Sequence, residues 1–230
     1  VPMTAPKRLP PARLAELLPP GVDCALELLP PAQTPGPVGF AWDEERDEVQ
    51  SAVPKRQREY AAGRRLAGEL LLNAGAKAGP LLTGPDRAPL WPAKYTGSIS
   101  HCDGLCAAAV ARISDHRSVG IDVEPATPLN PKLWSSILNP SEADRLEVMG
   151  ERGAMLATAH FSGKEALYKL IAADFGRFVG LLDVELRFSL MKFTFTAHGG
   201  ANDEERRKLA TVQGRWRITG RHVLTTATWS

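Results

Sequence analysis

Apolar and polar residues alternate at the centre of the chain. Val119, Ile121 and Val123 recur with the period of two that is typical of a β-strand with one buried face. Asp122 and Glu124 lie between and after them, and their two-residue spacing places both side chains on one face of a strand. The pattern therefore predicts a central strand that carries two neighbouring carboxylates opposite its apolar residues.

Helical and alternating periods predict the other elements. A helical segment is predicted over 43–73, interrupted at Pro54, which suits the first turn of a second helix. Another helical pattern covers 153–173, and Ser141 is predicted to cap a shorter helix before it, with Asp144 three residues on. Further strands are predicted at 97–101, 105–112, 184–197, 215–218 and 223–229, whereas the charged segment 203–208 is predicted to be a hairpin tip or loop.

The order of these elements predicts an α+β protein of two comparable halves that meet near residues 114–118. Residues 1–39 hold ten of the 19 prolines and are predicted to form a lead packed on the first half. The halves themselves are predicted at 40–116 and 117–230. No internal repeat is visible in the sequence.

Composition and charge narrow the class of protein. The 230 residues are 43% apolar and 23% charged, as in an ordinary globular chain. The net charge of +2 is far from the clustered basicity of a nucleic-acid binder, so nucleic acid is not an expected partner. Cys24, Cys102 and Cys106 suggest no disulfide framework and fit a reducing compartment. We find no run of 18 apolar residues and no secretion leader, and expect a cytoplasmic protein without a membrane span.

The carboxylate pair is the first candidate for chemistry. One or two carboxylates, completed by waters and phosphate oxygens, are what Mg²⁺ takes when it handles a phosphorylated substrate, although this spacing alone is more often a solvated acidic face. Gly120 is predicted to leave room for a ligand beside the pair. On the predicted helix, Glu165 and Lys169 share a face with Lys164 beside them, which adds a carboxylate for a metal and ammonium groups for phosphates.

These two stretches together form a recognisable pattern. Residues 120–124 read Gly-Ile-Asp-Val-Glu, and residues 161–169 read Phe-Ser-Gly-Lys-Glu-Ala-Leu-Tyr-Lys. A Ser-His pair at Ser100 and His101 precedes them. In these motifs the chain resembles the 4′-phosphopantetheinyl transferases of the Sfp type, in the branch that activates siderophore and other nonribosomal peptide synthetases (enterobactin synthetase component D-like). The motifs span roughly residues 56–169.

The resemblance implies a fold and a reaction. It implies a monomer of two similar α/β subdomains related by a pseudo-twofold axis, with the coenzyme in the cleft between them. The reaction moves 4′-phosphopantetheine from coenzyme A to a serine of an apo carrier protein (acyl, aryl or peptidyl) and releases adenosine 3′,5′-bisphosphate. It also implies Mg²⁺ held by Asp122, Glu124 and Glu165, with Glu165 as the proton acceptor and Lys164 and Lys169 stabilising charge on the phosphates.

The resemblance also assigns coenzyme contacts in the first half. Basic residues on the helix after Pro54 are typical of a solvated face when considered alone. The family places phosphate-binding cations there, which implies Arg56 and Arg64 on the 3′-phosphate, because a guanidinium binds phosphate through two parallel hydrogen bonds. Arg87, in a looser match to the family pattern, and the Ser100-His101 pair are implied as further contacts.

Two other functions are compatible with parts of the sequence. A non-catalytic module that binds coenzyme A or a carrier protein would need the arginines but not three converging carboxylates. A Mg²⁺-dependent nuclease is suggested by Pro85-Asp86 and the later acids, but Glu124 has no lysine two positions on.

Overall fold

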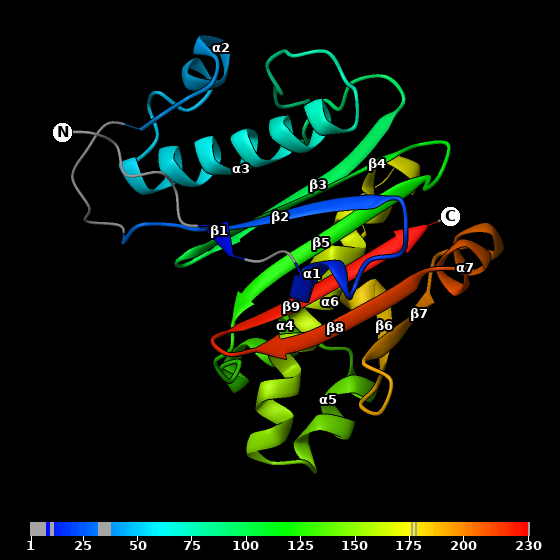
Figure 1. Cartoon of the computed structure of the whole chain (residues 1–230). Coiled ribbons are helices and arrows are strands. Elements are labelled where there is room, and N and C mark those ends of the chain that lie inside the picture. The colour runs from blue at the N-terminus through cyan, green and yellow to red at the C-terminus, as the bar shows by residue number, and fades with distance from the viewer. Residues whose placement is uncertain (1–7, 10–11, 32–37, 176, 178, 230) are drawn as a thin grey trace. The chain divides into compact units, whose positions relative to one another are not determined.

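The chain divides after Arg117 into two units, Val1–Arg117 and Ser118–Ser230 (Figure 1). The computed structural model describes residues 8–9, 12–31, 38–175, 177 and 179–229. Residues 1–7, 10–11 and 32–37 of the predicted proline-rich lead therefore lie outside the described residues, whereas residues 22–28 of it form a strand of the sheet in the first unit. Each unit combines helices with an antiparallel sheet, which confirms the predicted α+β class. Within the described part of the chain, no helix combines the length and the apolar content that a membrane span requires.

The first unit places one long helix on a four-stranded sheet of order β1-β2-β4-β3. This helix, α3, lies along the sheet (Figure 1). The sheet face under α3 carries small side chains such as Ala108 and Val110 of β4, which let Leu66 of the helix become fully buried. Pro54 is the first residue of α3, as predicted. The elements are β1 (Arg8–Leu9), α1 (Ala12–Ala15), β2 (Val22–Leu28), α2 (Asp43–Asp47), α3 (Pro54–Asn73), β3 (Tyr95–Cys102) and β4 (Leu105–Arg112).

The second unit packs the helix α6 on a five-stranded sheet of order β5-β9-β8-β7-β6. The predicted central strand is the edge strand β5, paired only with β9 among the described strands. The elements are β5 (Ser118–Pro125), η1 (Pro131–Leu133), α4 (Trp134–Ile137), α5 (Pro140–Glu147), α6 (Glu151–Phe175), η2 (Leu181–Asp183), β6 (Val184–Ser189), β7 (Thr194–Gly199), α7 (Asp203–Ala210), β8 (Gln213–Thr219) and β9 (His222–Trp229).

Gly120 allows close packing of α6 on β5 and does not leave the predicted room for a ligand. A Cβ atom at this position would lie 1.9 Å from the carbonyl oxygen of Ala166 in α6. The missing side chain thus lets α6 approach β5 closely, and the room that we expected for a ligand is filled by the helix backbone.

Three local predictions were wrong. The segment 184–197 is two strands, β6 and β7, joined by a turn in which Phe193 adopts a positive φ of 52°. The segment predicted as a loop at 203–208 lies in helix α7, which begins because the Asn202 side chain accepts a hydrogen bond from the Glu205 N–H. Helix α5 is capped by Asn139 rather than Ser141, in a reciprocal capping box with Glu142.

His160 in α6 makes the stability of the fold depend on pH. Its Nδ1 lies 2.9 Å from the Leu156 carbonyl oxygen, and its ring stacks on Phe188 at 4.2 Å. Burial lowers the pKa of His160 from 6.5 to about 4, because the charged imidazolium would lose its hydration. The unfolded chain therefore binds a proton that the folded chain does not. The contribution of neutral His160 is present above pH 6.5 and is lost as pH falls from 6.5 towards 4.

We expect His160→Gln to flatten this dependence. Between pH 6.5 and 4, the free energy of unfolding of the wild type should fall by about 1.4 kcal/mol per pH unit more steeply than that of the variant. Urea unfolding at four pH values measures the difference. The exposed His198→Gln should keep the wild-type slope, and equal slopes in the wild type and His160→Gln would contradict the prediction.

Candidate functional site

Asp122 is buried under α6, whereas Glu124 on the same face of β5 is half-buried. Asp122 is only 3% exposed because α6 covers this face, which excludes a merely solvated position for Asp122. Its Oδ1 accepts a hydrogen bond of 2.8 Å from the Lys169 ammonium, which also donates to the Ile121 carbonyl at 3.1 Å. Its Oδ2 accepts a hydrogen bond of 2.8 Å from Ser162. The predicted grouping of Asp122 with the Lys-Glu helix is therefore present in the fold.

Glu124 and Glu165 belong to the same electrostatic cluster. Burial, followed by repulsion from Asp122, raises the pKa of Glu124 to about 7, while Lys169 opposes the shift. Burial and Asp122 also raise the pKa of Glu165, again against Lys169. Glu124 and Glu165 are thus repelled by Asp122, and a cation would relieve this repulsion.

This cluster suits a metal that does not need a cage made entirely of protein. Among the described residues, no three His, Cys, Asp or Glu side chains already form a group that could hold a metal ion. Mg²⁺ typically uses one or two carboxylates together with waters and substrate phosphates. The carboxylates of Asp122, Glu124 and Glu165 fit this coordination preference of Mg²⁺ and do not fit a closed structural metal site.

Lys164 does not belong to this cluster, contrary to the expectation that it binds phosphate. Its side chain has no exposed surface, and its Nζ donates to Glu142 Oε2 at 2.6 Å and to the carbonyls of Ile137 and Leu181 at 2.9 and 2.8 Å. Burial lowers the pKa of Lys164, and Glu142 opposes the shift. An ammonium with three acceptors in the core is a structural tie between α6, α5 and the segment before β6. Lys164 and Glu165 differ because adjacent helix residues point about 100° apart.

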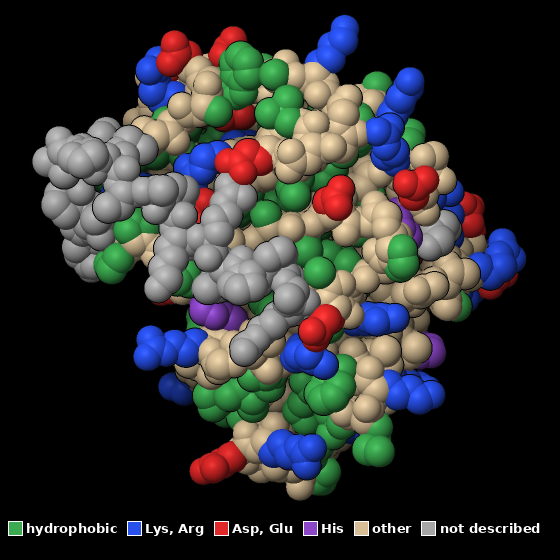
Figure 2. Space-filling model, in the orientation of Figure 1, with side chains coloured by type: hydrophobic (Ala, Val, Ile, Leu, Met, Phe, Trp, Pro, Cys, Tyr) green, Lys and Arg blue, Asp and Glu red, His purple; other side chains and the backbone are tan. Residues whose placement is uncertain are grey.

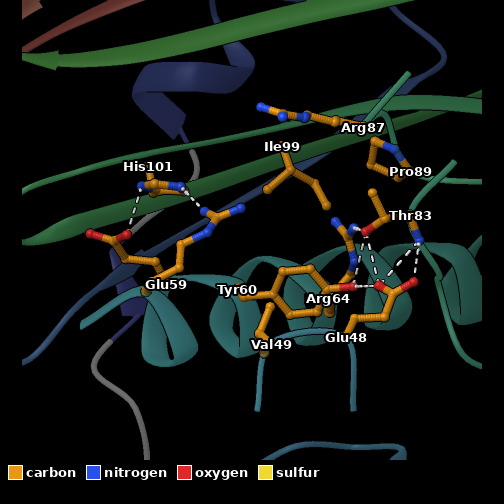
Figure 3. Close-up of a pocket in the computed structure, with 11 residues that line it drawn as sticks. Glu48, Val49, Glu59, Tyr60, Arg64, Thr83, Arg87, Pro89, Ile99 and His101 are labelled. Carbon is orange, nitrogen blue, oxygen red and sulfur yellow. Dashed lines mark hydrogen bonds and ion pairs between the residues drawn. The ribbon is translucent and has the colours of Figure 1, made fainter. Parts of the chain in front are cut away.

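The predicted cations of the first unit line one pocket. Arg56, Arg64, Arg87 and His101 surround a cavity of about 470 Å³ (Figure 3). Arg56 and Arg64 come from one face of α3, as their spacing predicted, and His101 comes from β3. The pocket is completed by Glu48, Val49, Glu59, Tyr60, Thr83, Pro89 and Ile99.

Both helix arginines are held in place inside this pocket. Arg64 donates to Thr83 Oγ1 at 2.9 Å and stacks over the Tyr60 ring at 4.3 Å, while its Nε has no hydrogen-bond partner among the described residues. Arg56 Nη1 lies 2.8 Å from His101 Nε2. Since a guanidinium can only donate, His101 Nε2 accepts, and its other nitrogen faces Glu59 at 3.5 Å. Pre-positioned arginines of this kind suit an anion.

Acidic groups also lie in the pocket, which sequence reasoning missed. Figure 3 shows Glu59 and His101 at one end and Glu48, Thr83 and Arg64 at the other. The Glu48 carboxylate accepts from Tyr60 and from the Thr83 N–H, and these bonds outweigh burial and lower its pKa. The Glu48 carboxylate therefore helps to hold the walls of the pocket in place. Glu48 is the C-cap residue of α2 and Thr83 forms an isolated β-bridge with Pro89, and neither residue belongs to a motif in the sequence.

The remaining predicted coenzyme contacts are Arg87 and Ser100. Arg87 lines the pocket from a turn, where its φ of 66° falls in the left-handed region. Ser100 is buried in β3 and is not among the residues that line the pocket. On the described part of the face drawn in Figure 2, Lys and Arg side chains are scattered among acidic and apolar ones.

Clustered carboxylates with a lysine suit a metal ion, and a pocket with ordered arginines suits a phosphorylated ligand. Residues 44–111 match the family model of the 4′-phosphopantetheinyl transferase N-terminal domain, and residues 118–227 match that of the 4′-phosphopantetheinyl transferase superfamily. The chain belongs to the 4′-phosphopantetheinyl transferases, as its motifs predicted, and is an enzyme of that class.

Three relatives illustrate the similarity. 4′-Phosphopantetheinyl transferase Svp of Streptomyces mobaraensis is 36% identical over 190 residues, which cover 78% of this chain and 75% of Svp. 4′-Phosphopantetheinyl transferase PptT of Mycobacterium tuberculosis (strain ATCC 25618 / H37Rv) is 31% identical over 208 residues, covering 85% and 86%. Enterobactin synthase component D of Escherichia coli (strain K12) is 34% identical over 147 residues, covering 63% and 68%.

Proposed function

We propose that this enzyme transfers 4′-phosphopantetheine from coenzyme A to a serine hydroxyl of an apo carrier protein, releases adenosine 3′,5′-bisphosphate and depends on Mg²⁺. The observation that carries the proposal is the cluster of Asp122, Glu124, Glu165 and Lys169, built from β5 and α6 within the second unit. Membership of the 4′-phosphopantetheinyl transferases supports 4′-phosphopantetheine as the group that is transferred.

Each member of the cluster has a role in this reaction. Asp122 and Glu124, with Glu165, hold the Mg²⁺, which when bound offsets negative charge on the pyrophosphate. Lys169 forms an ion pair with Asp122, and it stabilises charge on the transferred phosphate. The carrier serine oxygen forms a bond to the phosphorus of the 4′-phosphate, and the bond from that phosphorus to the leaving phosphate breaks.

Glu165 accepts the serine proton in this scheme. A carboxylate whose pKa is raised towards the working pH is a better proton acceptor than an ordinary glutamate, and burial raises the pKa of Glu165. The same side chain serves as a metal ligand, so its two roles overlap.

The pocket of the first unit receives the 3′-phosphate of coenzyme A. Arg56 and Arg64 bind it, with His101 as a further contact and Arg87 at the pocket margin. A phosphate that enters would replace the contact between Arg56 and His101 with stronger charge-assisted ones. That the coenzyme also spans the two halves stays a prediction.

The carriers belong to nonribosomal peptide or polyketide synthesis in this proposal, including siderophore pathways. The similarity to enterobactin synthase component D supports that choice. The enzyme acts as a monomer in the cytoplasm.

Direct transfer to a carrier tests the function. The enzyme is incubated with coenzyme A, MgCl₂ and a panel of apo acyl, aryl and peptidyl carrier proteins, and the carriers are weighed by mass spectrometry. We expect a mass increase of one phosphopantetheine group on at least one carrier, removed by EDTA and by changing the carrier serine to alanine. Binding of coenzyme A without any mass increase would favour the non-catalytic module.

Glu165→Gln is expected to separate the base from the ligand. Glutamine keeps an oxygen ligand and the size of the side chain but loses basicity, so turnover should fall by about 10²–10⁴. Saturating Mg²⁺ should not restore the rate, and the affinity for coenzyme A should change little. Full recovery in excess Mg²⁺ would show that Glu165 is only a ligand.

Arg56→Ala and Arg64→Gln are expected to reduce the preference for coenzyme A over dephospho-coenzyme A. A lost charge-assisted contact costs about 1.5–3 kcal/mol of binding free energy, which should appear only with the ligand that carries the 3′-phosphate. Calorimetry of both ligands measures this. Arg46→Ala, which removes an exposed arginine of α2, is the control, and an unchanged preference in both variants would return the pocket to a structural role.

A further inference from the structure

Two buried hydroxyl groups lie beneath Asp122. Ser162 is in the middle of α6 and Thr225 is the cross-strand neighbour of Asp122 on β9, and both are 0% exposed. Ala166 of α6 and Val223 of β9 are also fully buried. A buried hydroxyl is costly unless it is hydrogen-bonded, so the pair needs a reason.

The hydrogen bonds of the pair run in one direction. Ser162 Oγ lies 2.8 Å from Asp122 Oδ2 and 2.8 Å from Thr225 Oγ1, while Thr225 Oγ1 lies 2.9 Å from the Ser162 carbonyl oxygen. Ser162 Oγ donates to Asp122 Oδ2, so its single proton is committed to that carboxylate. The Thr225 proton must then point to Ser162, where both the carbonyl and the hydroxyl oxygen are in range. Thr225 thereby orients Ser162, and Ser162 orients Asp122.

This chain of bonds holds one side of the Asp122 carboxylate. Oδ2 is taken by Ser162, so Oδ1 is the oxygen that faces the Lys169 ammonium. The rotation of a carboxylate about its last bond is otherwise broad. Without the Ser162 hydroxyl, Oδ2 would lose this hydrogen bond, and the rotation of the carboxylate would be less restricted.

We propose that Ser162 and Thr225 are positioning residues that fix the Asp122 carboxylate for metal binding, an inference that rests on the proposed function. They touch neither substrate nor metal. Hydrogen bonds to a ligating carboxylate set its orientation, and removing such a partner typically costs about 10–100-fold in metal affinity.

Metal binding measured without turnover tests this. Mn²⁺ replaces Mg²⁺ as a spectroscopic probe, and free Mn²⁺ is followed by electron paramagnetic resonance in the presence of coenzyme A and without a carrier protein. We expect Ser162→Ala and Thr225→Val to raise the Mn²⁺ dissociation constant about 10–100-fold. The affinity for coenzyme A in the absence of metal should stay within about twofold, because neither residue lies in the pocket of the first unit. The double variant should lose no more than Ser162→Ala alone, because Thr225 acts only through Ser162.

Matched variants separate positioning from general damage. Thr228→Val removes a buried hydroxyl from the same strand, on the opposite face, where its only described contact is the Gln213 carbonyl at 3.5 Å, and should keep the wild-type constant. Equal weakening by Thr228→Val, or wild-type Mn²⁺ affinity in folded Ser162→Ala and Thr225→Val, would overturn the inference alone. Failure of the wild type to bind Mn²⁺, or unchanged binding in Asp122→Asn, would overturn the metal site of the proposed function as well.

Discussion

Asp122→Asn is expected to reduce phosphopantetheine transfer by roughly 10³-fold or more. The change removes the charge that attracts both Lys169 and a metal ion, and charge stabilisation by a bound metal is worth several kcal/mol in the transition state. Asparagine keeps the shape of the side chain and can still accept from Ser162. It is therefore a sharper test than alanine, because Asp122 is buried and truncation would also remove the acceptor of the Ser162 hydroxyl.

The rate should be measured at saturating coenzyme A and over a wide range of Mg²⁺ concentrations. Asp144→Asn, which changes an exposed acid of α5, is the control and should keep the wild-type rate. A folded Asp122→Asn enzyme that turns over normally would rule out Asp122 as a metal ligand.

Lys164→Met is expected to destabilise the second unit by about 3–5 kcal/mol. The variant removes the Lys164 ammonium from Glu142 and leaves that carboxylate buried without this ion-pair partner. The carbonyls of Ile137 and Leu181 also lose their donor. Urea unfolding measures the loss.

A second substitution distinguishes a structural role from a catalytic one. Adding Glu142→Gln to Lys164→Met removes the unpaired charge and keeps an acceptor for the Leu186 N–H, so the double variant should regain more than half of the lost stability. Lys192→Met, at an exposed site, should change stability by less than about 0.5 kcal/mol. If Lys164→Met were as stable as the wild type but inactive, a phosphate-binding role for Lys164 would be restored.

Much of this molecule could be predicted from local pattern. The alternation at 119–125 and the helical period at 153–173 predicted β5 and α6 because each depends only on residues close in sequence. The same is true of the arginine face of α3, where Arg56 and Arg64 lie two turns apart and do line one pocket. Helix α7 was missed although Asn202, three early acids and two late basic residues are local signals for a helix.

Packing decided the points at which the sequence was ambiguous. Alternation shows that Asp122 and Glu124 share a face, but only the position of α6 shows that this face is buried. Gly120 could have served a ligand or a helix, and the carbonyl of Ala166 takes the space. The turn before Thr194 contains no Gly or Pro, so no turn residue marked it.

The sequence by itself determined the family, the elements of the site and the residue types of its chemistry, because short motifs and periodicity are properties of neighbours along the chain. Only the tertiary structure decided that Lys164 points into the core while Glu165 and Lys169 face Asp122, and that Ser162 and Thr225 support that carboxylate. Thr225 lies 103 positions after Asp122, and its place opposite it follows from the register of β5 with β9. Such contacts depend on how distant segments pack together, which no local pattern records.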